Sequence, residues 1–213
     1  MIDAKMAHEL KTWLMQLDIS PNDCWENVEC KIKDVPSPKH FNFHLTDGAS
    51  KIWFVFDDKD FFLKWSTNDD GEAMQEVYYY EEAKIANLAK FFPRTEHFFS
   101  HNGVDFVMQE KVTIQAGDIW GGDMEAKYQK IAKTVPSRMV DKVQKDLNKV
   151  TGYTRHINTL WIACLLSLYG KKATKALCKF VQEHDINDLH GSNVGFKNDR
   201  PIILDFSGYH RQD

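Results

Sequence analysis

The stretch that decides the fold lies late in the chain: His184-Asp-Ile-Asn-Asp188-Leu-His190-Gly-Ser-Asn193-Val-Gly-Phe196, followed by Pro201-Ile-Ile-Leu-Asp205-Phe-Ser-Gly208. Two short apolar runs, 193–196 and 201–204, flank the turn 197–200, which predicts a β-hairpin. Asp188 and Asn193 stand five residues apart at the entrance to this hairpin, and Asp205 follows it. Such hard oxygen donors on short loops suit Mg²⁺ and the phosphates that it binds.

This order of residues resembles the catalytic core of the protein-kinase-like superfamily, in which Asp-x-x-x-x-Asn marks the catalytic loop and Asp-Phe-Gly follows a hairpin. The Asp-Leu-His at 188–190 is similar to aminoglycoside phosphotransferases and small bacteriophage kinases. The resemblance implies that Asp188 accepts the proton of a substrate hydroxyl and that Asn193 and Asp205 hold Mg²⁺. The alternative is that Asp188 and Asn193 cap turns and that Asp205 is a strand-end acid.

The same resemblance assigns a lysine and a glutamate upstream. Phe61-Phe-Leu-Lys64 ends the third predicted strand, where the family places the lysine that contacts the α- and β-phosphates. The following helix carries Glu76, Glu81 and Glu82, of which Glu76 is the first choice as the partner of Lys64 and Glu82 the reserve. Without the resemblance, a lone strand lysine is a solvated edge residue.

The segment Phe106-Val-Met-Gln109-Glu110-Lys-Val112 resembles the strand and hinge that hold adenine. Gln109 then occupies the gatekeeper position, and the Glu110 carbonyl and the Val112 amide read the adenine edge. The other interpretation is an ordinary edge strand that runs into a loop.

The glycine-rich loop is the weakest match to the family. Where the family has three glycines over the phosphates, the turn Asp47-Gly48-Ala-Ser50-Lys51 offers one. Gly48 and Ser50 are the expected phosphate contacts, with Ser50 as a hydroxyl donor. Because close approach of backbone amides needs glycine, a loose grip on the phosphates is expected.

The pattern along the chain predicts an α+β, bilobal protein-kinase-like fold. Residues 1–37 form an N-terminal helical extension, with a helix over 3–17. Residues 38–111 form the N-lobe, a five-stranded antiparallel sheet (near 41–45, 52–56, 61–65, 95–99 and 104–108) with one helix over 72–90. Residues 112–213 form a mostly helical, truncated C-lobe with helices over 123–134, 137–149, 154–169 and 172–183. A loop at 119–122 is a candidate hinge.

Composition limits the classes of function. The chain has 213 residues, 43% hydrophobic and 27% charged, with a net charge of −4, so a broadly basic nucleic-acid binder is not expected. The N-terminus lacks the pattern of a signal peptide, and the longest apolar run falls short of a membrane span, which predicts a cytoplasmic protein with no membrane partner.

Cysteines and histidines give no competing site. The four cysteines contain no C-x-x-C pair, so four reduced and mostly buried thiols are expected. His40 and His44 lie four apart, with His190 and His210 far along the chain, and lack a third ligand at useful spacing.

Two functions follow from the resemblance. The first is an ATP- and Mg²⁺-dependent phosphotransferase of the phage serine/threonine-kinase type, with a protein hydroxyl as first acceptor and a small-molecule hydroxyl as second. The alternative is a kinase-fold protein with weak or no turnover that binds and modulates a host or phage partner. The eroded glycine loop favours the alternative, and the set of Asp188, Asn193 and Asp205 favours the enzyme.

Overall fold

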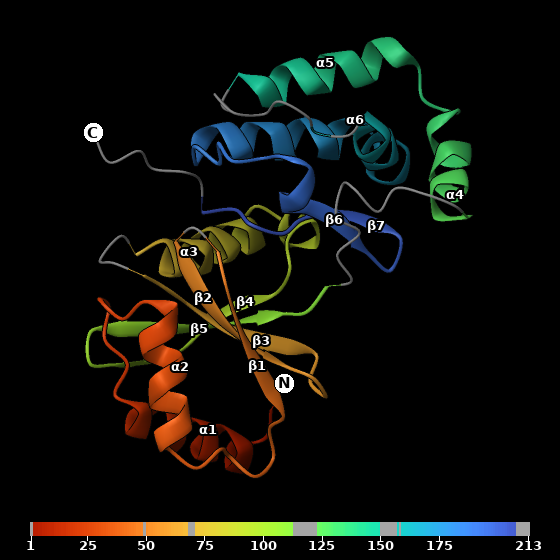
Figure 1. Ribbon diagram of the computed structural model, residues 1–213. Helices are drawn as coiled ribbons and strands as arrows, with labels where there is room; N and C mark the ends of the chain where they lie inside the picture. The colour runs from red at the N-terminus through yellow and green to blue at the C-terminus, as the bar shows by residue number, and fades with distance from the viewer. Residues whose placement is uncertain are drawn as a thin grey trace. The chain divides into compact units, whose positions relative to one another are not determined.

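The computed structural model of the chain is drawn in Figure 1. It describes residues 2–48, 50–67, 71–112, 123–149, 157 and 159–207. The predicted hinge at 119–122, Ala49 of the predicted phosphate turn and Gly208 lie outside these residues. The chain divides into two compact units, the first formed by Met1–Tyr78 and Arg94–Lys111 and the second by Tyr79–Pro93 and Val112–Asp213.

Unit 1 is built on a five-stranded antiparallel sheet. Its strands are β1 (Phe43–Asp47), β2 (Lys51–Phe56), β3 (Phe61–Ser66), β4 (Thr95–His101) and β5 (Val104–Glu110), in the order β1-β2-β3-β5-β4. All five predicted strands are present, and tight turns join β1 to β2, β2 to β3 and β4 to β5. The sheet therefore confirms the α+β class of the sequence prediction.

One face of this sheet packs against two N-terminal helices, α1 (Ala4–Leu17) and α2 (Trp25–Asp34). Alternate sheet residues such as Phe54 and Trp65 join Leu10, Trp13 and Val28 in one apolar cluster. The N-terminal helices thus share a core with the strands and do not form a separate body. Helix α1 fits the prediction for 3–17, whereas α2 was not placed individually by the sequence.

The other face of the sheet receives α3 (Glu72–Ile85), so helices lie on both sides of the strands (Figure 1). In unit 1, Ala73 and Val77 of α3 pack on Val107 of β5. The register sets Lys64 opposite Trp53 and opposite Val107, which places all three on this face. The apolar α1–α2 face and the charged α3 face are therefore separated by the thickness of one sheet.

Unit 2 is mostly helical. It contains η1 (Ala89–Phe91), α4 (Asp123–Ala132), α5 (Ser137–Asn148), α6 (Thr159–Glu183) and η2 (Gly191–Asn193). Gly170 interrupts α6 with φ 75° and ψ 166°, so α6 is two helical segments, as the predicted 154–169 and 172–183 anticipated. The first described residue of this helix is Thr159.

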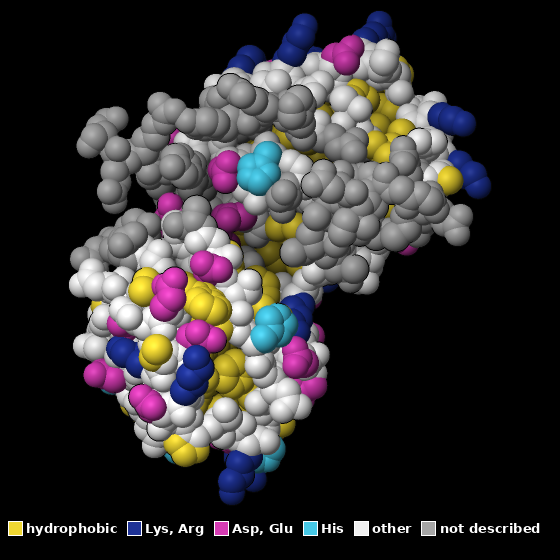
Figure 2. Space-filling model, viewed as in Figure 1, with side chains coloured by type: hydrophobic (Ala, Val, Ile, Leu, Met, Phe, Trp, Pro, Cys, Tyr) yellow, Lys and Arg dark blue, Asp and Glu magenta, His cyan; other side chains and the backbone are white. Residues whose placement is uncertain are grey.

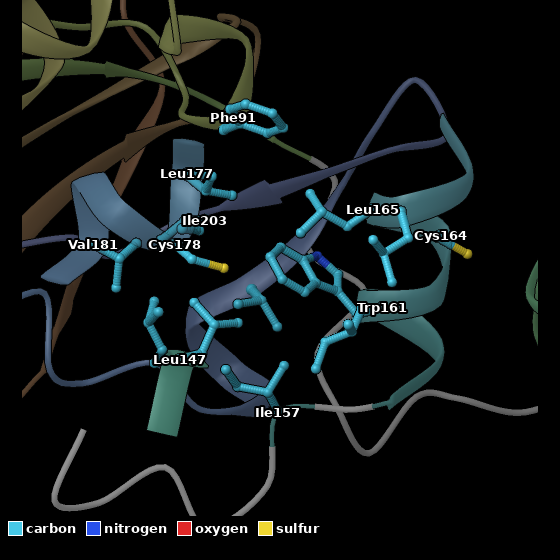
Figure 3. Packing of buried hydrophobic residues seen from close by; sticks show 14 of the residues in the cluster. Phe91, Leu147, Ile157, Trp161, Cys164, Leu165, Leu177, Cys178, Val181 and Ile203 are labelled. Carbon is cyan, nitrogen blue, oxygen red and sulfur yellow. The ribbon is translucent and has the colours of Figure 1, made fainter. Parts of the chain in front are cut away.

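A short hairpin lies near the end of the described part of unit 2. Strands β6 (Val194–Lys197) and β7 (Arg200–Ile203) pair where the sequence predicted them. The hairpin packs on α6: the Trp161 indole donates a hydrogen bond to the Gly195 carbonyl at 3.0 Å, and Ile203 lies among Leu165, Leu177 and their neighbours (Figure 3).

The outer side of α5 in unit 2 is charged. Helix α5 buries Val140 and Leu147, while Arg138, Asp141, Lys142 and Lys145 are exposed. Lysine and arginine side chains stand out along the upper edge in Figure 2, over α5. Lys/Arg on the outer side of an amphipathic helix is typical of a solvated face, so this surface alone indicates no partner.

Candidate functional site

A buried polar cluster lies between the α3 face of the sheet and α3. Lys64 of β3 is 2% exposed and Glu76 of α3 is 0% exposed. The Lys64 ammonium donates to Glu76 Oε2 and, at 3.1 Å, to Gln109 Oε1. The Gln109 amide donates to Glu76 Oε2 at 2.9 Å and to the Thr95 hydroxyl at 2.9 Å. Lys64, Glu76 and Gln109, each singled out in the sequence, are therefore brought together.

The reserve partner of Lys64 lies elsewhere. The Glu82 carboxylate is 3.0 Å from His184 Nε2 in unit 2, and Glu81 pairs with Lys84 on the exposed side of α3. Within the described residues, Glu76 is the carboxylate that meets Lys64. Their roles toward a nucleotide remain predictions.

The cluster contains a second lysine and a second glutamate that sequence reasoning missed. Lys51, the first residue of β2, is 3% exposed, and its ammonium lies 3.1 Å from Glu76 Oε1 and 3.5 Å from Glu72 Oε2. The contact with Glu76 Oε1 lacks the alignment of a hydrogen bond. Two signals could have found this pair: Lys51 shares a sheet face with Lys64, and Glu72 precedes Glu76 by four residues on one helix face.

The turn predicted to hold phosphates has its groups engaged within unit 1. A Cβ on Gly48 would lie 2.5 Å from the Trp53 ring, so the glycine is required by the packing of that ring. The Ser50 hydroxyl donates to Glu72 Oε2 at 2.5 Å. Both residues thus make contacts within unit 1.

The predicted adenine-binding segment continues β5. The Glu110 amide donates to the Arg94 carbonyl at 2.8 Å, and the Glu110 carboxylate accepts the Arg94 amide at 3.2 Å. The Lys111 amide donates to the Asp60 carbonyl at 2.8 Å. These bonds fix the strand up to the point where unit 2 begins at Val112.

The predicted catalytic loop is the segment before β6 in unit 2. The Asn193 side-chain amide donates to the Asp188 carboxylate at 3.0 Å and to the Asp188 carbonyl at 2.8 Å. His190 Nε2 lies 3.6 Å from the same carboxylate, whose side chain is 33% exposed. The flanking Ile186 and Leu189 are fully buried. Two apolar anchors therefore hold a loop that carries a solvent-reachable carboxylate.

Asp205 is tied to this loop through the backbone. The Leu204 amide donates to the Asn193 carbonyl at 2.8 Å, which joins the end of β7 to the start of β6. The next side chain, Phe206, is fully buried, with its ring centroid 4.8 Å from that of Phe92. Asp205 itself is partly exposed and accepts the Ser207 hydroxyl at 3.2 Å.

These oxygens fit a magnesium ion better than a transition metal. Among the residues with described positions, no three His, Cys, Asp or Glu side chains gather as a metal site. Mg²⁺ in nucleotide enzymes is bound by one or two carboxylates together with substrate phosphates and water. Asp205 can supply the carboxylate, and Asn193 can add an amide oxygen. His40 pairs with Glu9 at 2.5 Å and His44 with Asp57 at 3.1 Å, as expected of surface histidines.

A cavity of about 450 Å³ lies away from this chemistry, between the α1–α2 connection and the β1–β2 turn. Of the predicted site residues, it is lined by Gly48, together with Trp25, Asp47 and Ile52 among others. Ile52 belongs to the α1–α2 face of the sheet, opposite the Lys64 cluster. The cavity therefore touches the predicted phosphate turn at Gly48, and its lining includes none of Lys64, Glu76 and Gln109.

No family model and no curated protein matches the chain. The solved structures that are similar to this chain include aminoglycoside phosphotransferase APH(2'')-Ib bound to ADP. Its sequence identity is 12% and its TM-score is 0.40, and the match covers 86% of this chain and 69% of that one. A ternary complex of APH(2")-IIa with streptomycin and ATP has 14% sequence identity and a TM-score of 0.37. This match covers 97% of this chain and 72% of that one. Scores this low do not establish a shared fold, so the chemistry rests on the residues of this chain.

No helix among the described residues combines the length and the apolar character that a membrane crossing requires.

Proposed function

We propose that the protein is an ATP- and Mg²⁺-dependent phosphotransferase that acts on a hydroxyl group. The observation that carries the proposal is the Asp188–Asn193 pair at 3.0 Å, which the Leu204–Asn193 backbone bond links to the strand end before Asp205. Two carboxylates and an amide thus flank the open end of the β6–β7 hairpin, the donor set that phosphoryl transfer with Mg²⁺ needs.

The buried Lys64–Glu76 pair supports the proposal. Removing two such charges from water costs several kcal/mol per ion, and apolar replacements are often no less stable. A buried pair is therefore weak evidence for a stabilising role. A functional role explains the pair better, because Glu76 fixes an ammonium that can donate hydrogen bonds to the oxygens of a polyphosphate.

Each residue has a distinct task in this account. Lys64 holds the α- and β-phosphates, and Glu76 with Gln109 orients it. Asn193 and Asp205 hold Mg²⁺, which when bound neutralises phosphate charge. Asp188 accepts the proton of the attacking hydroxyl, and its Asn193 bond fixes the carboxylate for that task.

The experiment is transfer of labelled γ-phosphate from ATP in the presence and absence of Mg²⁺. Asp188→Asn is compared with Asp185→Asn, because Asp185 is an exposed acid three residues upstream with φ 48°, a conformation that asparagine tolerates. Mg²⁺-dependent transfer that falls in the first variant and persists in the second is expected. Equal activity of the two variants would move the acid–base role elsewhere.

Within this proposal, a protein serine or threonine hydroxyl of the phage-kinase type is the first acceptor, and a small-molecule hydroxyl is the second. Degenerate serine/threonine peptides and free aminoglycosides, each offered with labelled ATP, separate the two. The proposed location is the cytoplasm, where ATP is available.

A second candidate is a kinase-fold protein with weak or no turnover that binds and modulates a host or phage partner. The Ser50–Glu72 bond and the packing of Trp53 on Gly48 favour it, because both engage groups that a phosphate-binding turn would offer. Mg²⁺-dependent stabilisation by ATP in a thermal shift assay is expected of the enzyme and not of this alternative.

A further inference from the structure

The β1–β2 turn and the start of α3 meet in a second buried ion pair. Glu72 Oε2 accepts the Ser50 hydroxyl at 2.5 Å and lies 3.5 Å from the Lys51 ammonium. The Lys51 and Glu72 side chains are 4% and 9% exposed. A carboxylate oxygen thus receives a hydroxyl donor and an ammonium from neighbouring residues of one turn.

This set of donors has the chemistry of an anion site. An ammonium and a hydroxyl that converge on one anionic oxygen are donors that a phosphate oxygen accepts equally well. Glu72 stands in the first turn of α3, where the positive end of the helix dipole also favours an anion. The carboxylate is therefore held by contacts that a phosphate could take over.

Glu72 is not needed to complete the Lys64 site. Glu76 Oε2 already binds Lys64 and Gln109, while Oε1 faces Lys51 at 3.1 Å. Lys51 and Glu72 therefore add one positive and one negative charge to a pair that is already neutral. Burying two further ions carries a desolvation cost that the fold could avoid with apolar residues.

We infer that Ser50 and Lys51 form a second phosphate-binding subsite for a polyphosphate ligand and that the Glu72 carboxylate occupies it as an internal competitor in this structure. The inference rests on the proposed function and deepens it. Lys51 takes over the role of the absent glycines, supplying charge from a side chain where backbone amides cannot approach closely. Nucleotide binding then exchanges Glu72 for phosphate on Lys51 and Ser50.

This exchange predicts effects of opposite sign for the two members of the pair. Glu72→Gln removes the competing charge while keeping an acceptor for Ser50, so the affinity for Mg²⁺-ATP should rise about fivefold or more. Lys51→Met should lower it about tenfold or more, the loss of one charge-assisted contact. Lys51→Arg keeps the charge and should retain most of the affinity.

Calorimetric titrations with Mg²⁺-ATP and with adenosine test the inference. Adenosine has no phosphate, so its affinity should change little in all three variants, whereas a distorted fold would lower both affinities. Glu81→Gln is the matched control, because it removes one exposed carboxylate from the same helix. The double variant Lys51→Met/Glu72→Gln removes both charges and covers the case in which Lys51→Met alone does not fold.

The outcomes separate the inference from the proposed function. Tighter ATP binding by Glu72→Gln, with adenosine and Glu81→Gln unchanged, supports the subsite. A parent protein that binds ATP while Glu72→Gln binds it equally or more weakly overturns the subsite and leaves the proposed function standing. A parent protein that binds neither ATP nor adenosine overturns both.

Discussion

The Asn193 side-chain amide donates to the Asp188 carboxylate at 3.0 Å. A second bond, from the same amide to the Asp188 carbonyl at 2.8 Å, closes the loop on itself. The Asp188 side chain is still 33% exposed, so its orientation is fixed while it remains open to a substrate. This combination of a held and accessible carboxylate is what a proton acceptor requires.

Asp188→Asn should lower turnover by about 10²- to 10⁴-fold, the usual contribution of a positioned acid–base group. The affinity for ATP should change little, because the carboxylate acts on the acceptor hydroxyl and mainly in the transition state. Asparagine keeps an oxygen that can accept from Asn193, so the loop should persist. Rates and ATP affinities measured on the same preparation check this; near-normal turnover would contradict the assignment.

Asp205→Asn should abolish the Mg²⁺-dependent part of the ATP affinity and leave the fold intact. The amide supplies an oxygen without charge, and Mg²⁺ binding depends strongly on carboxylate charge. Phe206, which anchors this segment, is untouched by the change. Titrations of ATP with and without Mg²⁺ provide the measurement, and an unchanged Mg²⁺ effect would show that Asp205 is no ligand.

Gly170→Ala should destabilise the protein by about 1–3 kcal/mol. Gly170 has φ 75° and ψ 166°, a region that is essentially restricted to glycine, while a Cβ there meets nothing within 4 Å. The cost therefore comes from the backbone alone. Lys171→Ala, one residue later on the exposed side, should stay within about 0.5 kcal/mol. Denaturant unfolding of both variants compares them, and equal midpoints would argue for a continuous helix.

Thiol labelling should divide the cysteines into two classes. Cys24 and Cys30 are exposed, whereas Cys164 and Cys178 are buried, which corrects the expectation of mostly buried thiols. Burial raises the pKa of the Cys164 thiol to about 11 and, together with Asp146, that of Cys178 to about 12. Both therefore remain protonated and unreactive near pH 8. A maleimide reagent should label two thiols in the folded protein and four after denaturation.

The strands could be predicted from sequence because their alternation is local. Phe54 and Phe56 point to one face and Trp53 and Val55 to the other, a period that a sheet imposes by itself. The break in α6 could be predicted for a similar reason, because it depends on the backbone conformation of one residue, Gly170. The α+β class follows from such local signals.

The second ion pair has signals in the sequence, the shared sheet face of Lys51 and Lys64 and the spacing of Glu72 and Glu76, but its burial does not follow from them. Lys51 follows a turn, and a lysine there is usually solvated; its burial depends on where α3 packs on the sheet. The burial of Glu72 likewise depends on this packing, because an acid in the first turn of a helix is common on a solvated surface. Glu76 was chosen only through the family resemblance, whereas packing selects it over Glu82 because Glu82 meets His184.

The measurement that tests the central claim most directly is Mg²⁺-dependent ATP binding by the parent protein, by Lys64→Met and by Lys84→Met. Lys64 is buried against Glu76, whereas Lys84 forms an exposed pair with Glu81, so the two variants remove the same charge from a predicted site and from a solvated surface. The account predicts binding by the parent and by Lys84→Met, with strong loss in Lys64→Met although Glu76 retains Lys51. Absence of Mg²⁺-dependent ATP binding in the parent, or equal binding by all three proteins, would contradict it.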